Sequence, residues 1–471
     1  MKRRDFIVSA GAGSLALTFS GFSKRALALG NEKVFTSLRA KGYGELFPAA
    51  SKNTGETLIA LPKGFEYKVF GKTGDLMKDG LKTPKDHDGM AAFFRNGEIR
   101  LVRNHEINDD VPKENITLAP DNNYDQTAGG GTTTVVIDSK TLEITRDFVS
   151  LSGTLNNCAG GATPWGSWIS CEETTYGKTV FLEDDDDEVE KQKVGGFDKP
   201  HGYCFEVPAS ANSTVAAVPL KDMGRFSHEA VAFDAKRGIA YLTEDAKPSG
   251  FYRFLPKRFN RLAEGGTLQM LAVKDRPNFD TTKGLIETDF DVNWVTIDDP
   301  DPEEADTNET AVYEQGKAKG AAKFKKLEGC FADKFGRIYF VSSSGGDTGG
   351  GQIWLYVPTS KDEGRLRLLF EAPDRELLDM PDNVCMYPNS NFLYICEDSD
   401  YVGVGGTPEN YIRILTPSGK VADFARNMTP GFEESEFAGT CFSPNGDVLF
   451  ANIQEPGMTL AIWGDWKNFN S

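Results

Sequence analysis

A hairpin pattern that recurs six times limits what this chain can fold into. Each copy has an acidic or polar residue, a small residue, a short apolar stretch, a turn, and a second apolar stretch followed by acids. The copies begin at His87, Cys158, His228, Leu327, Pro381 and Phe437. Apolar residues that alternate around a Gly or Asn-Gly turn are typical of β-hairpins, so the pattern predicts six hairpins.

Further short strand-like stretches lie between the copies, for example TTTVVID and GQIWLYV, and long helical periodicity is missing almost throughout. Six units of about four short strands predict an all-β fold, a six-bladed β-propeller whose blades pack against their neighbours. A β-sandwich or two separate β domains are the alternatives. We expect one domain over residues 29–471, with acidic loop insertions near 183–200 and 287–325, where the chain is rich in Asp and Glu.

The first 28 residues have the order of a twin-arginine export signal. Arg3 and Arg4 precede a short apolar stretch rich in Gly and Ala, then Lys24 and Arg25, and a small-residue site that ends at Ala28. The apolar run is shorter than the roughly 18 residues typical of a membrane span, so a membrane anchor is the weaker alternative. We expect the twin-arginine translocase as a partner, a periplasmic or extracellular location, no stable membrane anchor, and a monomer.

Charge and cysteine content exclude several classes of function. The net charge of −18 repels nucleic acid and anionic lipid, so neither is an expected partner. Seven cysteines cannot all pair within one chain, and none forms a CxxC pair of the kind that holds structural zinc. The sequence also lacks a GxSxG elbow, a GxxxxGK[ST] loop and an HExxH motif.

The two ends of a hairpin return to the same edge of a sheet, which predicts a ring of polar residues at one mouth of the central channel. The predicted ring comprises Asp88, Cys158, Glu229, Glu328, Asp382 with Asn383, and Glu436, backed by Glu106, Glu173, Glu244 and Glu397. So many carboxylates in one funnel need either protons or bound cations. Oxygen ligands suit calcium or magnesium, whereas a thiolate favours a transition metal such as iron. The alternative is that Cys158 is a buried apolar side chain and that Glu172 and Glu173 are an exposed strand end.

The chain combines the twin-arginine start with the motifs NNCAGGATPWGSWISCEE, GRFSHEAVAFD, YLTEDA, FYRFLP and PDNVCMYP with NFLYICED. Together these motifs resemble the PhoX alkaline phosphatase family, from about residue 45 to the C-terminus. The resemblance implies a six-bladed propeller, export, and an active site of calcium and ferric ions that hydrolyses phosphomonoesters. Clustered metals would then stabilise charge on the phosphate and activate a bound water, without a protein nucleophile.

By the same resemblance, Cys158 corresponds to an iron-ligating thiolate, and Glu173, Glu229 and Glu328 to carboxylate ligands. Glu436 is similar to a late carboxylate ligand, while Glu172, Asp88 and Asp382 are further candidate metal ligands from the hairpin argument. Lys326 stands where the resemblance implies an Arg, and is a candidate to bind substrate phosphate as a point charge. His228 is a candidate either for contact with substrate or for a structural hydrogen bond.

Two other functions are compatible with the sequence. One is a calcium-dependent propeller hydrolase such as a lactonase, which needs no thiolate. The other is an exported binding propeller whose ions only stabilise the fold. Iron together with calcium would favour the phosphoester hydrolase over both.

Overall fold

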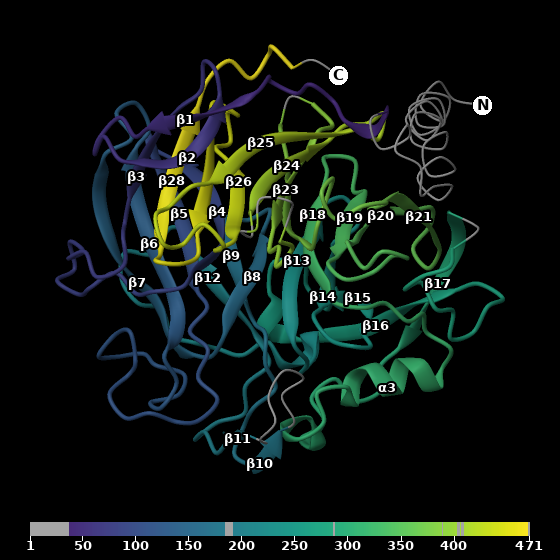
Figure 1. Cartoon of the computed structure of the whole chain (residues 1–471). Helices are drawn as coiled ribbons and strands as arrows, with labels where there is room; N and C mark the ends of the chain where they lie inside the picture. Colours follow the sequence, from purple (N-terminus) through teal and green to yellow (C-terminus); the bar gives the residue numbers. More distant parts are fainter. Residues whose placement is uncertain are drawn as a thin grey trace.

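The structure is a computed structural model that describes residues 37–183, 192–285, 288–388, 390–402, 406 and 409–469. Almost all of its regular secondary structure consists of short β-strands (Figure 1), and the all-β class predicted from the sequence is confirmed. The predicted export signal, residues 1–28, lies outside the described residues. None of the described helices has the length and apolar character that a membrane span needs.

Each of the six recurring patterns forms an antiparallel hairpin. The first strands are β4 (His87–Arg95), β8 (Asn157–Ala162), β13 (His228–Asp234), β18 (Leu327–Ala332), β22 (Pro381–Met386) and β26 (Phe437–Phe442). The second strands are β5 (Glu98–His105), β9 (Ser167–Glu172), β14 (Ile239–Glu244), β19 (Ile338–Ser342), β23 (Leu393–Glu397) and β27 (Val448–Ile453).

The first strands lie around a common axis. They contact one another in the order β4, β8, β13, β18, β22 and β26, and β26 in turn contacts β4. The arrangement is propeller-like, because every hairpin turns its first strand toward the middle of the molecule. The polar ends of these strands therefore meet at one place.

Outer strands extend each hairpin toward the surface. They are β6 (Gly130–Asp138), β7 (Ile144–Thr154), β12 (Cys204–Pro208), β15 (Phe251–Pro256), β16 (Gly266–Val273), β20 (Gln352–Pro358), β21 (Gly364–Glu371), β24 (Tyr411–Leu415), β25 (Val421–Asn427) and β28 (Met458–Trp463). β17 (Asp289–Thr296) pairs with both β16 and β21 and so joins two hairpin units into a nine-stranded sheet.

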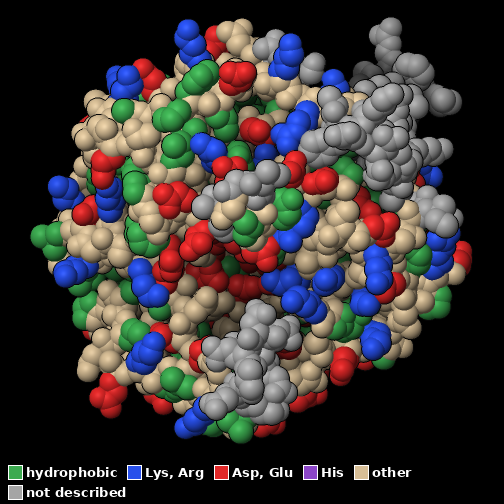
Figure 2. Space-filling model, in the orientation of Figure 1, with side chains coloured by type: hydrophobic (Ala, Val, Ile, Leu, Met, Phe, Trp, Pro, Cys, Tyr) green, Lys and Arg blue, Asp and Glu red, His purple; other side chains and the backbone are tan. Residues whose placement is uncertain are grey.

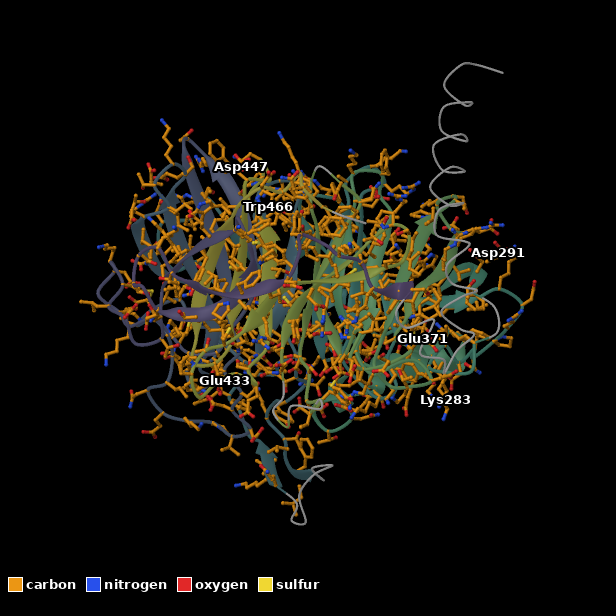
Figure 3. All side chains as sticks on the ribbon, turned by 45° about the horizontal axis from the view of Figure 1, so that its top comes forward. Lys283, Asp291, Glu371, Glu433, Asp447 and Trp466 are labelled. Carbon is orange, nitrogen blue, oxygen red and sulfur yellow. The ribbon has the colours of Figure 1, made fainter. Side chains whose placement is uncertain are left out.

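The start of the described chain packs on its end. β3 (Glu66–Phe70) pairs with β28, and β1 (Leu46–Ala50) with β2 (Thr57–Pro62) extends the sheet of β25. Trp466 packs edge-on against Phe65, and its indole N–H donates to the carbonyl of Asp447 at 2.9 Å (Figure 3). The pairing of β3, near the start of the described chain, with β28, near its end, closes the ring without leaving an open sheet edge there.

The two segments predicted to be acidic insertions have structure of their own. In the first, β10 (Val180–Glu183) and β11 (Gln192–Gly195) form a hairpin, and residues 184–191 lie outside the described part. The second contains β17, the 3₁₀ turn η3 (Glu303–Asp306) and the helix α3 (Ala311–Ala318).

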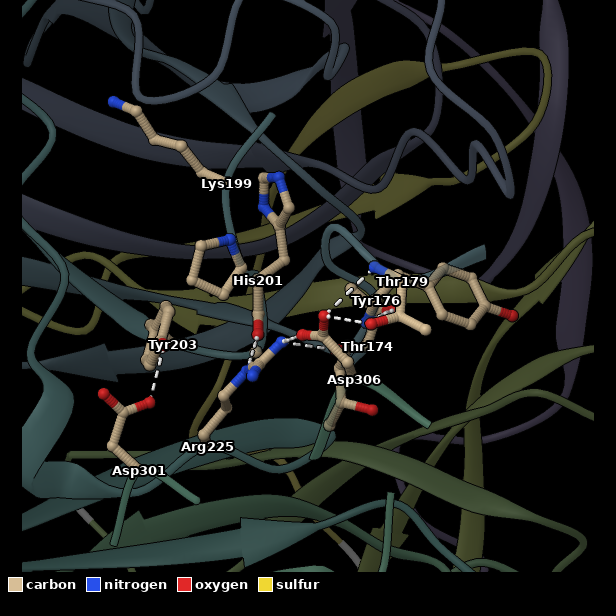
Figure 4. A network of polar contacts seen from close by, with 12 residues as sticks. Thr174, Tyr176, Thr179, Lys199, His201, Tyr203, Arg225, Asp301 and Asp306 are labelled. Atoms are coloured by element: carbon tan, nitrogen blue, oxygen red, sulfur yellow. Dashed lines mark hydrogen bonds and ion pairs between the residues drawn. The ribbon is translucent and has the colours of Figure 1, made fainter. Parts of the chain in front are cut away.

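Acids of the second segment bind neighbouring elements rather than one another. Asp306 forms an ion pair with Arg225 and accepts from the Thr179 hydroxyl at 3.0 Å (Figure 4). Asp301 accepts from the Tyr203 hydroxyl at 2.6 Å. These contacts fix the loop against the sheet.

Candidate metal centre

Each first strand carries the same irregularity near its start, one residue later in β26 than in the other five. In all six hairpins two residues of the first strand lie opposite one residue of the second, which is a β-bulge. The bulged residue pairs are Asp88–Gly89, Cys158–Ala159, Glu229–Ala230, Glu328–Gly329, Asp382–Asn383 and Gly439–Thr440. A bulge bends a strand and re-aims a side chain. Here it turns the first residue of five pairs into a common cavity.

Small residues follow the cavity side chains because the first strands approach each other closely. A Cβ on Gly329 would lie 2.5 Å from the carbonyl oxygen of Asp382 on the next strand. Gly439 has a φ of +62°, and its Cβ would lie 2.5 Å from the carbonyl oxygen of Asp88. The sixth hairpin therefore has a glycine where the other five have a cavity-lining side chain.

A second set of polar residues comes directly after the second strands. These residues are Glu106, Glu173, Asp245, Ser343, Asp398 and Gln454. In every hairpin the backbone N–H of this residue donates to the carbonyl of the residue that precedes the first strand, at 2.8 to 3.3 Å. The accepting residues are Asp86, Asn156, Ser227, Lys326, Met380 and Glu436. Lys326 and Glu436 thus hold equivalent positions at the rim, in two different hairpins.

The side chains of these sets enclose a cavity of about 110 Å³. Its lining consists of Asp88, Glu106, Cys158, Glu173, Glu229, Asp245, Lys326, Glu328, Ser343, Met380, Asp382, Asp398 and Glu436. Figure 2 shows Asp and Glu side chains gathered in a hollow near the middle of the face in view. The lining thus holds nine carboxylates, one thiol and one ammonium group.

Four groups of these residues have the spacing of metal ligands, and three of the groups share residues. Within each group one ligand atom per residue lies within 4.8 Å of the others. The groups are Cys158–Glu173–Glu229, Asp88–Glu106–Glu436, Glu173–Asp245–Glu328 and Glu229–Glu328–Asp382. One group contains a soft sulfur, whereas the other three contain only hard oxygens.

Unpartnered oxygens show that the cavity fits cations. Oδ1 of Asp88, Oδ1 of Asp245 and Oε2 of Glu436 are buried and accept no hydrogen bond from the described residues. A buried carboxylate oxygen without a donor is costly, and a bound cation removes that cost. The types of ligand atom in the cavity and its unpartnered oxygens therefore both favour a bound cation.

Burial and mutual repulsion raise the pKa values of several of these acids. Burial, followed by the charges of Asp245 and Glu106, raises the pKa of Glu173 well above its usual range. Burial also raises the pKa of Asp382 to about 7. The pKa of the Cys158 thiol is raised by burial and then by Glu229 and Glu173. Cations and protons therefore compete for this site.

Lys326 lies in the cavity, as the sequence argument required of a phosphate-binding residue. Its Nζ lies 2.9 Å from Oδ2 of Asp245 and 3.9 Å from Oε1 of Glu328. Burial lowers the pKa of Lys326, but the charges of Asp245 and Glu328 outweigh burial and raise it above its usual value. Its φ of +45° places the residue in the left-handed region just before β18.

The structure places Glu172 outside the cavity, which corrects its assignment as a candidate ligand. Its Oε1 lies 2.7 Å from Nδ1 of His201 and 2.9 Å from the N–H of Leu155. Its Oε2 accepts from the N–H groups of Gly202 and Tyr203 at 2.8 and 3.0 Å. Four donors already satisfy this carboxylate, so it stabilises the sheet interior.

The side chain of His228 also lies outside the cavity. Its Nε2 lies 2.9 Å from the carbonyl of Gly224, and its Nδ1 lies 3.5 Å from Sγ of Cys204. The ring is fully buried and does not line the cavity. Only its backbone reaches the site, because Sγ of Cys158 donates to the His228 carbonyl at 3.1 Å. These contacts correspond to the predicted structural hydrogen bond rather than to contact with substrate.

Two of the predicted backing residues are one position away from the residues that line the cavity. Glu244 bonds the Tyr252 hydroxyl at 2.8 Å, and Glu397 bonds Arg413 at 2.9 Å, both inside the sheets. Asp245 and Asp398 line the cavity instead. Successive side chains of a strand point to opposite faces, so the last strand residue faces the sheet interior and the next residue faces the cavity.

Asn104 is a positioning residue that the sequence argument missed. Its Nδ2 donates to the carbonyls of Cys158 and Ala159 at 2.8 and 2.7 Å, while Oδ1 accepts from Trp168 and Ser170. Asn452 donates in the same way to the carbonyl of Asp88, at 2.5 Å. Each Asn fixes the bulge of the next hairpin. The signal in the sequence is an Asn two residues before Glu106 or Gln454.

Comparison with solved structures finds distant neighbours, two of which are described here. A gluconolactonase from Xanthomonas campestris is 12% identical with a TM-score of 0.32, over 89% of this chain and 97% of its own. A protein assigned as a 6-phosphogluconolactonase from Bacteroides uniformis is 11% identical with a TM-score of 0.33, over 86% of this chain and 88% of its own. No curated protein matches the chain.

A family comparison covers nearly the whole chain. The model of the family described as alkaline phosphatase PhoX matches residues 43–457, which include every hairpin and the whole cavity lining. The match agrees with the resemblance read from the motifs around Cys158, Glu229 and Asp382. The chain belongs to the alkaline phosphatase PhoX family and is a phosphoric ester hydrolase.

Proposed function

We propose that the protein is an exported phosphatase whose cavity binds ferric iron and calcium and releases phosphate from small phosphomonoesters. Cys158, Glu173 and Glu229 would hold the iron, because this is the group that includes a thiol. The three carboxylate groups would hold calcium, which prefers several oxygen ligands. Glu173, Glu229 and Glu328 each belong to two groups, so they would bridge neighbouring ions.

One observation carries this proposal. A thiol and carboxylates from different hairpins converge within 4.8 Å in a cavity that contains buried oxygens without a hydrogen-bond donor. Structural stabilisation alone would not need a ring of nine acids, since uncompensated carboxylates destabilise a fold. Clustered cations, by contrast, suit the binding of a phosphate dianion.

The chemistry divides between the bound cations and the chain. The cations would supply charge stabilisation for the transferring phosphoryl group and a water of lowered pKa. Lys326 presents an ammonium group at the rim, where it can bind a phosphate oxygen and orient the ester. Ser343 donates to Glu328 at 2.7 Å and so holds that carboxylate in place. No histidine lines the cavity, so the chain itself offers no imidazole base there.

Three further features belong to the same proposal. The cyclic contacts of the first strands support a six-bladed propeller with the metal site at one mouth of its channel, as a single domain over residues 29–471. The twin-arginine pattern of residues 1–28 supports export to the periplasm or beyond the cell. We also propose that the protein acts as a monomer.

The test is metal analysis of natively exported protein combined with assays on 4-nitrophenyl phosphate and on an aliphatic phosphomonoester. We expect iron and calcium in the same preparation, hydrolysis of both esters at mildly alkaline pH, and loss of activity after chelation of calcium. Protein that contains both metals and hydrolyses no phosphoester would refute the proposal. Calcium without iron would refute the assignment of Cys158.

A further inference from the structure

Three chain segments meet beside Lys326 and form a small ladder at the rim of the cavity. Phe324 exchanges backbone hydrogen bonds with Ser249 at 2.9 and 3.0 Å, and the N–H of Lys326 donates to the carbonyl of Ala246 at 2.9 Å. On the other side Lys323 donates to Phe279 at 2.9 Å. The segment 323–326 is therefore held between residues 246–249 and the segment that starts at 279.

Each segment of this ladder carries lysine. The rim lysines, as we call them, are Lys247, Lys283, Lys323, Lys325 and Lys326. In a chain of net charge −18, five cations around one ladder are a marked reversal of the overall charge. Figure 2 shows Lys and Arg side chains grouped at the edge of the acidic hollow.

Carboxylates neutralise only part of this positive charge. Lys323 pairs with Asp280 at 2.9 Å, and Lys326 pairs with Asp245. Lys283 and Lys325 have no acidic partner among the residues that the structure describes. Lys325 is half-buried, and burial together with the charges of Lys247 and Lys283 lowers its pKa. The rim lysines therefore repel one another, and an anion bound between them would relieve that repulsion.

We propose that Lys325 and Lys283 form a second anion subsite, which binds a second phosphate group of a substrate whose scissile phosphate lies in the cavity beside Lys326. This inference rests on the proposed function and names its substrate class: small phosphomonoesters that carry a second phosphate, such as sugar bisphosphates. Lys326 lines the cavity, whereas Lys325, the residue before it, does not. The two sites are therefore neighbours at the rim. The acidic surface elsewhere disfavours long polyanions, so a small bisphosphate ester fits better than nucleic acid.

The test compares fructose 1,6-bisphosphate with fructose 6-phosphate on metal-loaded protein. We expect kcat/KM to be roughly tenfold higher for the bisphosphate, which is beyond the twofold gain that two equivalent esters would give. Lys325→Gln and Lys283→Gln should each lower that ratio, and the double variant should bring it to about two. High salt should reduce the ratio in wild type, because exposed charges are screened.

Lys274→Gln provides the matched control. Lys274 lies in the turn after β16 and pairs with Glu363 at 3.2 Å, so the variant has the same change of charge without touching the rim. Its substrate ratio should equal that of wild type. A ratio near two in wild type, or an unchanged ratio in the double variant, would overturn the subsite. Absence of turnover of either ester by fully loaded protein would instead overturn the proposed function.

Discussion

Oε1 of Glu172 lies 2.7 Å from Nδ1 of His201 inside a sheet, although the next residue, Glu173, lines the cavity. Burial lowers the pKa of His201, but the charges of Glu172 and Asp125 outweigh it and raise the pKa to about 9. Two adjacent glutamates therefore have opposite roles. One stabilises the sheet, and the other contributes to the candidate metal site.

The first prediction uses this pair. Glu172→Gln breaks a buried ion pair and should lower the free energy of unfolding by about 3 kcal/mol while the folded protein keeps its metals. Glu173→Gln should lower iron and calcium content and leave the metal-free fold as stable as wild type or more so, because it removes one of several repelling acids. Thermal unfolding and metal analysis of the two variants give the result. Similar metal losses in both would contradict it.

Lys326 leads to a second prediction. Lys326→Ala removes the ammonium group at the rim and should lower kcat/KM for phosphomonoesters by about tenfold to a hundredfold with metal content retained. Lys326→Arg keeps the charge and presents a planar guanidinium group with two donors for the phosphate, so its activity should equal or exceed that of wild type. Steady-state kinetics on 4-nitrophenyl phosphate measure both. Wild-type kinetics for Lys326→Ala would exclude this residue from substrate binding.

A third prediction concerns Cys158. Cys158→Ser replaces the thiol with a hard hydroxyl, so iron and any visible thiolate-to-iron absorption should be lost while calcium is partly retained. The fold should remain, since the change removes little apolar area and the hairpins share the core. Iron per chain is measured side by side in wild type and variant. Equal iron in both would show that Cys158 is a packed thiol rather than a ligand.

The fourth prediction is a pH dependence of the metal-free protein. The pKa of Asp382 is raised from 3.8 to about 7, so the folded state holds a proton that the unfolded state releases as pH rises above 3.8, and stability falls across this window. His201 acts in the same direction, since its raised pKa gives stability that is fully present below 6.5 and is lost as pH rises through about 9. The chelated protein should therefore have a lower Tm at about pH 8.5 than at about pH 6. Calcium and iron should reduce that difference. A Tm that rises with pH after chelation would contradict the prediction.

Much of the candidate site could be predicted from particular residues. Asp88, Cys158, Glu229, Glu328 and Asp382 follow from the hairpin pattern, because each stands at the same position of a recurring unit and equivalent positions meet around the axis. Lys326 and Glu436 also line the cavity, as predicted. An Asn recurs two residues before Glu106 and Gln454, but the role of Asn104 is visible only in the structure, because it is a contact with the backbone of another hairpin.

The sequence by itself determined the all-β class, the hairpins and the family, because alternation of apolar residues and local turns are properties of neighbouring residues. Only the tertiary structure decided which member of each acidic pair enters the cavity. Glu172 and Glu173, Glu244 and Asp245, and Glu397 and Asp398 are chemically alike, and side chains alternate between two faces of a strand. A shift of one residue therefore exchanges the sheet interior for the cavity, and the bulge and the register that select between them exist only once the hairpins have packed.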